Sequence, residues 1–179
     1  MFRPALQPTR EAQERVAAAL RTVAAWSVGK GCPWLLIVGP TGCGKSHLLK
    51  AALRESVLLK DTGYYMTAAQ FDRNVKRFGL DEEDPDDYVE KIAHLSGPLI
   101  IDDLGAGYMD KSGYTATKFE RLIDQRYEAE SPTAFASNLG MDQFKAQFGE
   151  RVVSRITDRR LSQVISLAGC SDMRGSTER

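Results

Sequence analysis

Apolar residues in the first part of the chain follow two different spacings. Residues 9–27 repeat Val16, Leu20 and Val23 at helical spacing behind Thr9, a residue type that caps helix N-termini. The next apolar stretch, WLLIVG, is continuous, which is typical of a strand buried on both faces of a parallel sheet. We therefore expect an amphipathic helix followed by a buried strand.

The same alternation continues to the end of the chain. Short apolar runs predict strands at 34–39, 63–67, 98–103, 133–137 and 163–167. Helical spacing predicts helices at 45–56, 68–78 and about 113–129, and two short helices divided at Gly149. The polar run LDEEDPDDY at 80–88 is expected to be a solvated loop joining two helices. Alternating strands and helices predict an α/β fold with helices on both faces of a parallel sheet.

The composition indicates one globular domain, because 179 residues with 42% apolar side chains can bury a single core. We expect an N-terminal helix and linker at 1–30, a core at 31–168 and a tail at 169–179. The sequence shows no apolar run of membrane-spanning length and no signal-peptide core, so we expect a cytoplasmic protein without a membrane partner. Three cysteines without metal-ligand spacing predict free thiols: Cys32, Cys43 and Cys170.

The distribution of charged residues indicates one local basic patch. The net charge is zero, so a protein that coats nucleic acid through general basicity is excluded. The stretch FGERVVSRITDRR carries Arg151, Arg155 and Arg159 at a four-residue spacing, which would place them on one helix stripe, followed by Arg160. Like charges at this spacing repel unless an anion faces them. The stripe therefore predicts a negatively charged partner.

The motif GPTGCGKS fits G-x-x-x-x-G-K-S and lies between a predicted strand and a predicted helix, the context that such a phosphate-binding loop requires. Its glycines allow backbone N–H groups to surround phosphate oxygens at a helix N-terminus. We expect Lys45 to reach the β- and γ-phosphates of ATP and the Ser46 hydroxyl to bind Mg²⁺. Cys43 is interpreted as a small residue rather than a redox switch, and His47 as a packing residue. The expected nucleotide contacts are Gly39, Pro40, Thr41, Gly42, Cys43, Gly44, Lys45, Ser46 and His47.

An acidic pair follows the predicted strand at 98–103. In a parallel sheet, ligands bind beyond the carboxyl ends of the strands, so Asp102 and Asp103 are expected to face the phosphate site. Asp102 would hold Mg²⁺ through water, and Asp103 would orient or deprotonate the attacking water. Taken alone, two aspartates after a strand are also compatible with a simple turn.

Four stretches in this order, GPTGCGKSHLLKA, LIIDDLG, LIDQRYEAESPTAFASNL and GERVVSRI, resemble the DnaC-like helicase loaders and the IstB-like transposition helpers. The resemblance covers residues from about 8 to 174. It implies a P-loop NTPase with a RecA-like AAA+ core, related to the replication initiator DnaA, that hydrolyses ATP between self-associated subunits. It also implies replicative helicase and single-stranded DNA as partners. Loaders often carry a separate N-terminal helicase-binding domain, which we expect either to be missing here or to lie outside residues 1–179.

The resemblance assigns further residues. Asn138 matches the sensor-1 position, which contacts the γ-phosphate or the attacking water; read alone, it is equally a turn residue before Gly140. Arg155 matches the arginine finger, which reaches the nucleotide of a neighbouring subunit, and Arg151 looks like a supporting residue.

Two features, one near the site and one in the tail, depart from the superfamily pattern. Much of the superfamily has Glu in place of Asp103, and the shorter side chain is expected to slow hydrolysis. The tail after the last predicted strand is too short for a full helical lid. Arg174 in that tail is a candidate for a further phosphate contact.

Other functions remain open at the level of sequence. Helicase loading and transposition are not distinguished by these motifs. A nucleoside monophosphate kinase shares the phosphate loop but needs an arginine-rich acceptor site, which the acidic segment at 68–97 suits poorly. A nucleotide-gated DNA-binding module without turnover needs only the loop and Ser46.

A candidate DNA contact lies in FDRNVKRFG, where basic and aromatic residues mix as in single-strand binding surfaces. An amphipathic helix with aromatic side chains in the core explains the same pattern. The residues concerned are Phe71, Arg73, Lys76, Arg77 and Phe78.

Overall fold

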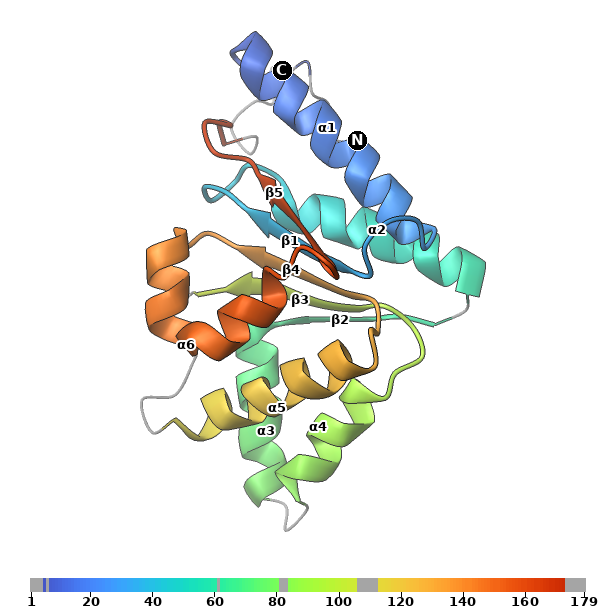
Figure 1. Ribbon diagram of the computed structural model, residues 1–179, viewed down its shortest axis with the longest axis vertical. Coiled ribbons are helices and arrows are strands. Elements are labelled where there is room, and N and C mark those ends of the chain that lie inside the picture. Colours follow the sequence, from blue (N-terminus) through green and yellow to red (C-terminus); the bar gives the residue numbers. More distant parts are fainter. Residues whose placement is uncertain (1–4, 6, 61, 81–83, 106–112, 173–179) are drawn as a thin grey trace.

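The computed structural model describes residues 5, 7–60, 62–80, 84–105 and 113–172. Within these residues, five parallel strands form one sheet in the order β2-β3-β4-β1-β5 (Figure 1). The strands are β1 (Trp34–Val38), β2 (Tyr64–Thr67), β3 (Leu99–Leu104), β4 (Thr133–Ser137) and β5 (Ser162–Ser166). The fold is the α/β fold of a P-loop NTPase, as the sequence predicted.

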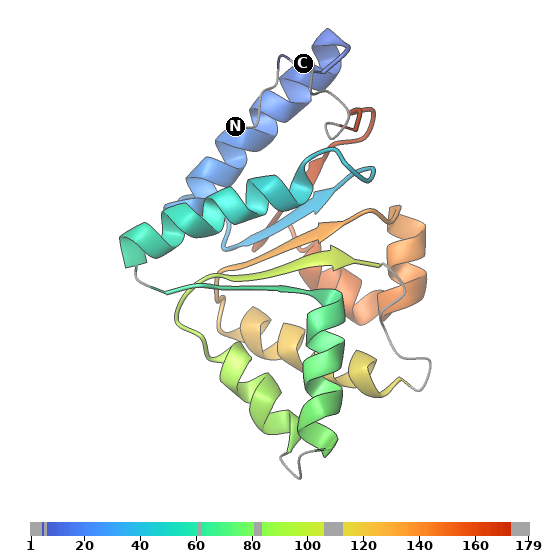
Figure 2. The ribbon, with the colours of Figure 1, turned by 180° about the vertical axis from the view of Figure 1, so that it is seen from behind.

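Helices cover both faces of the sheet (Figure 2). On one face lie α1 (Arg10–Ser27) and α2 (Lys45–Lys60). On the other lie α3 (Ala68–Leu80), α4 (Pro85–Ala93), α5 (Tyr114–Glu128) and α6 (Met141–Ile156). None of these described helices combines the length and apolar composition that a membrane span requires. No helix lies between β5 and Asp172, the last described residue.

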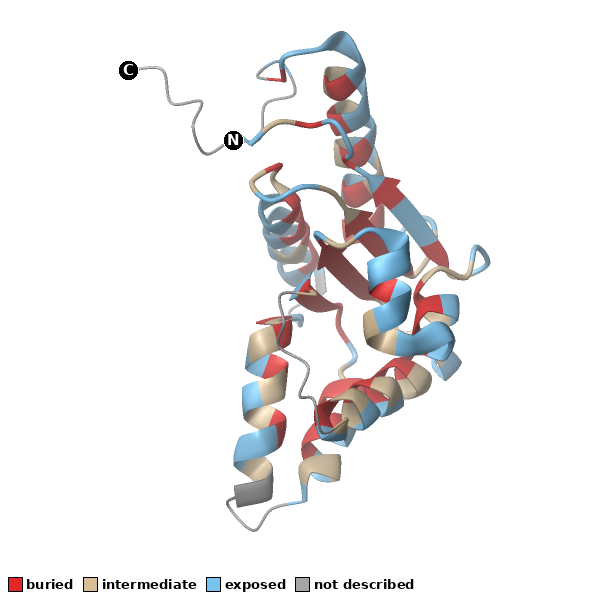
Figure 3. Ribbon diagram, turned by 90° about the vertical axis from the view of Figure 1, so that its left-hand side faces the viewer, coloured by how far each residue is buried: buried red, intermediate tan, exposed pale blue. Residues whose placement is uncertain are grey.

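Alternate side chains of each central strand enter different cores. Leu35 and Ile37 pack under α1 and α2, whereas Trp34 and Leu36 pack under the other four helices. This follows from the period of two along a strand, which sends successive side chains to opposite faces. The continuous apolar runs of the sequence are therefore buried on both sides, as the buried colours of the central strands show (Figure 3).

Local signals explain the start of α1 and the kink in α6. The Thr9 side chain accepts a hydrogen bond from the backbone N–H of Ala12 at 3.2 Å and caps α1, as predicted. In α6, Gly149 has φ 78° and ψ 161°, so two helical pieces meet there at a kink, also as predicted.

The expectation of a loop throughout 80–88 is wrong for its second half. Asp84 caps α4, Pro85 follows it, and Asp86 and Asp87 lie in the first turn. Carboxylates favour a helix N-terminus because its free N–H groups carry partial positive charge, and proline is tolerated there because it needs no N–H partner.

One arginine is completely buried between α5 and the sheet. The guanidinium of Arg126 donates to the Thr133 hydroxyl at 2.8 Å, and to the carbonyls of Ala93 at 3.0 Å and Pro132 at 2.8 Å. Further bonds reach the carbonyls of Ile92, Leu95 and Gly97. Burial lowers the pKa of Arg126 to about 10. These bonds tie the end of α4 to the start of β4 and satisfy carbonyls that the helix end leaves free.

Candidate nucleotide-binding site

The sheet order brings three sequence motifs to one edge. Because β4 lies between β1 and β3, Ser137 pairs with Val38 on one side and with Leu104 on the other. Gly39 begins the phosphate loop after β1, and its N–H donates to the Ser137 carbonyl at 3.2 Å. Asn138 follows Ser137 directly. The loop, the acidic pair and Asn138 therefore lie at neighbouring carboxyl ends, as predicted.

The phosphate loop has the backbone conformation that its glycines permit. Gly42 has φ 81° and Gly44 has φ 96°, both in the left-handed region that favours glycine. Lys45 begins α2, is 9% exposed, and its Nζ donates to the carbonyls of Gly39 and Pro40, each at 2.8 Å. The ammonium group is thus held across the mouth of the loop, where phosphate oxygens can replace the carbonyls as its partners.

Cys43 is fully buried beneath the loop. Burial raises the pKa of its thiol, although the nearby Lys45 cation acts in the opposite direction. A Cβ on Gly39 would lie 2.8 Å from the Leu167 Cβ and 3.1 Å from the Cys43 Sγ, so only glycine fits there without displacement. Cys43 is therefore a small packing residue, as predicted, and its protonated thiol is poorly reactive.

The acidic pair lies on a β-bulge. The register between β3 and β4 shifts between Ile101 and Leu104, and Asp103 has φ 59°, an uncommon value for a residue with a side chain. Asp102 is only 3% exposed, whereas Asp103 is exposed. The bulge thus gives the two carboxylates different environments, one buried and fixed and one open to solvent, which suits the different roles expected for them.

The sequence interpretation did not identify Ser137 as a site residue. Its hydroxyl links the ends of β3 and β4 at this edge of the sheet. Its hydroxyl donates to the Leu104 carbonyl at 2.6 Å and accepts from the Leu139 N–H at 3.1 Å. These bonds fix the backbone on both sides of Asn138, whose side chain is exposed at the edge. The SNL motif contained this signal, because a serine at a strand end commonly bonds nearby backbone groups.

Two residues at the start of α2 point to solvent. Ser46 is exposed, which leaves its hydroxyl accessible to a metal ion. His47 is exposed as well, so the expectation that it packs is wrong. Lys45, the first residue of α2, is buried, and the apolar contacts of this helix begin after His47, at Leu48.

The segment after β5 places a carboxylate, which the sequence did not predict, beside the phosphate loop. A Cβ placed on Gly42 would lie 2.1 Å and 2.3 Å from the two carboxylate oxygens of Asp172. The segment is held because the Ser171 N–H donates to the Gln7 side-chain oxygen at 2.9 Å. The Asp172 carboxylate therefore lies directly over the glycine turn. Arg174, predicted as a phosphate contact, lies outside the described residues.

The arginine stripe faces carboxylates of the same chain. Arg151 forms ion pairs with Glu120 at 3.2 Å and Asp124 at 2.6 Å, and Arg155 forms an ion pair with Asp124. The Arg155 guanidinium also lies 5.4 Å from the ring centroid of Tyr127. The second half of α6 leads away from the carboxyl ends of the strands (Figure 1). Arg155 is therefore not brought to the nucleotide edge of its own chain, and its role as a finger stays a prediction.

The stripe is shorter than expected. Because α6 ends at Ile156, Arg159 lies beyond the helix and does not continue the stripe. Arg160 is exposed and forms an ion pair with Asp158 at 2.7 Å.

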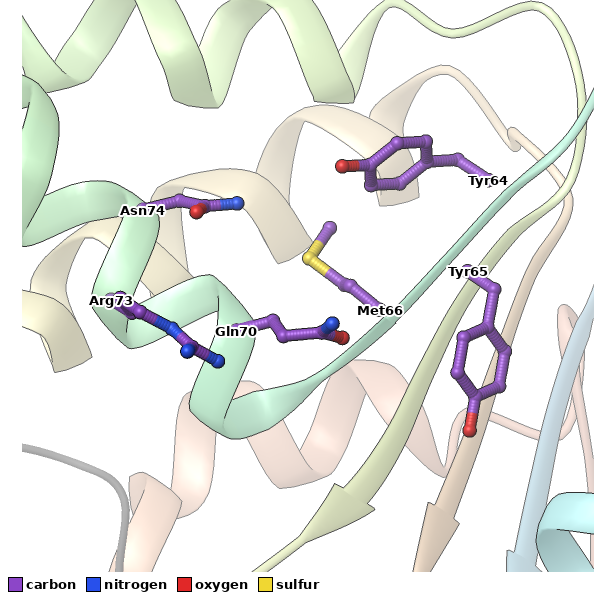
Figure 4. A pocket seen from close by; sticks show the side chains of 6 residues that line it. All are labelled: Tyr64, Tyr65, Met66, Gln70, Arg73 and Asn74. Carbon is purple, nitrogen blue, oxygen red and sulfur yellow. The ribbon is translucent and has the colours of Figure 1, made fainter.

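The candidate DNA segment forms α3, and its aromatic residues belong to the core. Phe71 is 1% exposed, and Phe78 stacks on Tyr88 with ring centroids 5.0 Å apart. The interpretation as an amphipathic helix with core aromatics is therefore correct, while Arg73, Lys76 and Arg77 remain exposed. Beside α3, a shallow hollow of about 330 Å³ is lined by Tyr64, Tyr65, Met66, Gln70, Arg73 and Asn74 (Figure 4).

Sequence comparison assigns nearly the whole chain to one family. Residues 6–176 match the IstB-like ATP binding proteins. The chain is also 27% identical over 124 residues to the replicative helicase loader DnaC of Escherichia coli K12, an alignment that covers 66% of this chain and 47% of the loader. The chain thus spans about half the length of the curated relatives that it matches.

Similar folds occur in replication proteins of known structure. A DnaC helicase loader superposes with a TM-score of 0.71 at 22% identity, covering 89% of this chain and 92% of the other. DnaI gives 0.70 at 21% identity, covering 96% and 95%. The replication initiator DnaA, bound to AMPPCP and single-stranded DNA, gives 0.63 at 22% identity, covering 88% of this chain and 45% of that protein. At these identities the likeness concerns the AAA+ fold.

Proposed function

We propose that this chain, which belongs to the family of IstB-like ATP-binding proteins, is an AAA+ ATPase that helps to load the replicative helicase during initiation of DNA replication. One observation carries the proposal: the phosphate loop, the bulged acidic pair and Asn138 converge at one edge of the sheet. The similarity to the DnaC loader supports the step from ATPase to helicase loading.

The residues at this edge fit ATP with Mg²⁺. The loop supplies left-handed glycines and the Lys45 ammonium for phosphates, and the exposed Ser46 hydroxyl and the buried Asp102 carboxylate are oxygen ligands of the kind that Mg²⁺ prefers. When bound, Mg²⁺ would neutralise charge on the β- and γ-phosphate oxygens. Asp103, exposed at the bulge, would orient the attacking water, and the Asn138 amide would hold that water or the γ-phosphate.

In this proposal the active unit is a pair of subunits. Arg155 would complete the site of a neighbouring subunit, since an arginine carries a permanent charge and can grip phosphate oxygens through two N–H groups. The second half of α6, which carries Arg155, leads away from the nucleotide edge of its own chain (Figure 1), and this is consistent with action in trans. Self-association is therefore required for hydrolysis.

The proposed partners are the replicative helicase and single-stranded DNA, and the proposed location is the cytoplasm. The competing transposition role predicts association with a transposase instead. A nucleoside monophosphate kinase is disfavoured, because the segment between α3 and β3 presents the carboxylates of α4, which would repel an anionic acceptor. A binding module without turnover would bind ATP but not hydrolyse it.

Two measurements test this function. Purified protein should hydrolyse ATP, and single-stranded DNA should alter the rate; the absence of hydrolysis at all protein concentrations would favour a binding module. In a pull-down with the purified helicase of the host, retention of the helicase only in the presence of ATP supports loading. Failure to retain the helicase, together with ATP-dependent retention of a transposase, would establish the transposition role.

A further inference from the structure

The hydroxyl of Tyr65 donates a hydrogen bond to Asp102 Oδ2 at 2.5 Å. The other carboxylate oxygen, Asp102 Oδ1, accepts from the N–H of Asp103 at 2.8 Å. Both oxygens of this buried carboxylate are therefore bonded to a donor within the protein. Each oxygen keeps a further lone pair, through which it can bind a metal ion or a metal-bound water.

Strand geometry brings Tyr65 to this position. In the register of β2 and β3, Tyr65 lies beside Ile100 and Thr67 lies beside Asp102. The backbone of Tyr65 is therefore two residues before the position that pairs with Asp102. Two residues of strand span about 6.6 Å, a distance that a tyrosine side chain can reach along the sheet. Tyr64 and Tyr65 leave β2 on opposite sides (Figure 4). Of these two side chains, Tyr65 packs against the core that lies under α1 and α2.

The Tyr65 ring also contacts the helix that carries the other expected magnesium ligand. The Lys50 ammonium lies 4.9 Å from the ring centroid. Lys50 follows Ser46 by four residues on α2, so the two side chains share a helix face. Tyr65 thus lies between the helix of Ser46 and the strand of Asp102.

We propose that Tyr65 is a positioning residue for Mg²⁺: its hydroxyl fixes the Asp102 carboxylate in the orientation that binds the metal together with Ser46. This inference rests on the proposed nucleotide site and extends that site to β2, a strand that belongs to none of the sequence motifs described above. A carboxylate with a free side chain must lose rotational freedom when the metal binds, whereas one already held by two donors loses little. Removal of such an outer partner typically lowers metal affinity by about 10- to 100-fold.

The test compares Tyr65→Phe with Tyr64→Phe in the full chain. Both changes remove one hydroxyl and keep the ring, and Tyr64 lies on the opposite side of the same strand. Binding of a fluorescent ATP analogue is followed while Mg²⁺ is titrated. For Tyr65→Phe we expect the half-saturating Mg²⁺ concentration to rise about tenfold, with nucleotide affinity in excess EDTA unchanged. Tyr64→Phe should behave as wild type.

A second measurement separates positioning from a general structural effect. In an Asp102→Asn background the oriented carboxylate is already lost, so adding Tyr65→Phe should change the Mg²⁺ requirement no further. A wild-type Mg²⁺ requirement in Tyr65→Phe, or the same tenfold rise in the Asp102→Asn background, would overturn the positioning role and leave the nucleotide site intact. Absence of Mg²⁺-dependent ATP binding by the wild-type protein would overturn both.

Discussion

The guanidinium of Arg155 forms an ion pair with the carboxylate of Asp124, which lies on the neighbouring helix of the same chain. The Arg155 side chain is only 20% exposed, and Arg151 shares the same carboxylate. The anion that the arginine stripe faces within one chain is therefore a protein carboxylate. If Arg155 serves a neighbouring subunit, assembly must either exchange this partner for phosphate oxygens or use Asp124 to orient the guanidinium.

Mixing two inactive variants tests the action of Arg155 in trans. Arg155→Ala should bind ATP normally, because its own loop and Lys45 are intact, but should lose hydrolysis by about 10³-fold or more. Mixed with Lys45→Ala, it should regain part of the activity, since an interface then combines one intact loop with one intact finger. Steady-state ATPase assays over a range of protein concentrations provide the measurement.

Arg160→Ala is the matched control, because Arg160 is exposed and pairs with Asp158 beyond the helix. It should keep wild-type activity. A mixture that stays inactive although both variants assemble would show that Arg155 does not act in trans. The same conclusion would follow from wild-type specific activity that is independent of concentration down to monomeric protein.

Lys45 and Asp103 are expected to separate binding from hydrolysis. Lys45→Ala should abolish ATP binding by removing the ammonium that spans the loop, whereas Asp103→Asn should bind ATP and fail to hydrolyse it. Equilibrium binding and turnover are measured on both variants, with circular dichroism to confirm folding. Equal ATP affinity in wild type and Lys45→Ala would refute the assignment of the phosphate loop.

The Asp172 carboxylate beside Gly42 should weaken ATP binding, because two negative groups then approach one loop. Asp172→Asn should tighten ATP binding by about two- to tenfold at low salt, with a smaller gain in high salt, where charges are screened. Asp87→Asn, an equal charge change at an exposed position of α4, should have no effect. Weaker binding in Asp172→Asn would instead indicate that the carboxylate stabilises the loop conformation that binds ATP.

Arg126 should be essential for stability. Arg126→Met leaves several buried carbonyls without a donor, so we expect a loss of about 3 kcal/mol or more in the free energy of unfolding. Arg126→Lys should restore little, because an ammonium cannot reproduce the planar set of donors. Urea unfolding gives the values. Arg121→Met, at a more exposed position of the same helix, should cost about 1 kcal/mol or less.

The basic face of α3 provides a test of DNA binding. Lys76 pairs with Asp72 at 2.9 Å but is 46% exposed, so its charge remains available to a phosphate. If Lys76 and Arg77 contact single-stranded DNA, the double alanine variant should bind more weakly, with a salt slope smaller by about 1.4. Fluorescence anisotropy measures both quantities.

Arg10→Ala with Arg21→Ala, on the opposite face of the sheet, is the charge-matched control. If the Lys76/Arg77 double variant has unchanged affinity and salt slope, α3 does not lie on the path of the DNA.

Sequence alone predicted the order of most elements and the backbone conformation of the phosphate loop. Both depend on local spacing: glycines between a strand and a helix, a threonine before α1, and continuous apolar runs in strands covered on both faces. Local patterns gave a wrong prediction at 80–88, because the carboxylates that cap α4 resemble those of a polar loop. They also placed Arg159 on the helix, because no recognised signal marked the end of α6 at Ile156.

Tertiary structure alone decided which side chains meet. The bulge that separates Asp102 from Asp103 depends on how β3 pairs with β4, and the bond between Tyr65 and Asp102 joins residues 37 positions apart. Asp172 reaches Gly42 only because β5 lies beside β1. The pairing of Arg155 with Asp124 requires α6 to pack on α5. Such contacts follow from strand order and helix packing, which local patterns do not encode because they report only interactions within a few residues along the chain.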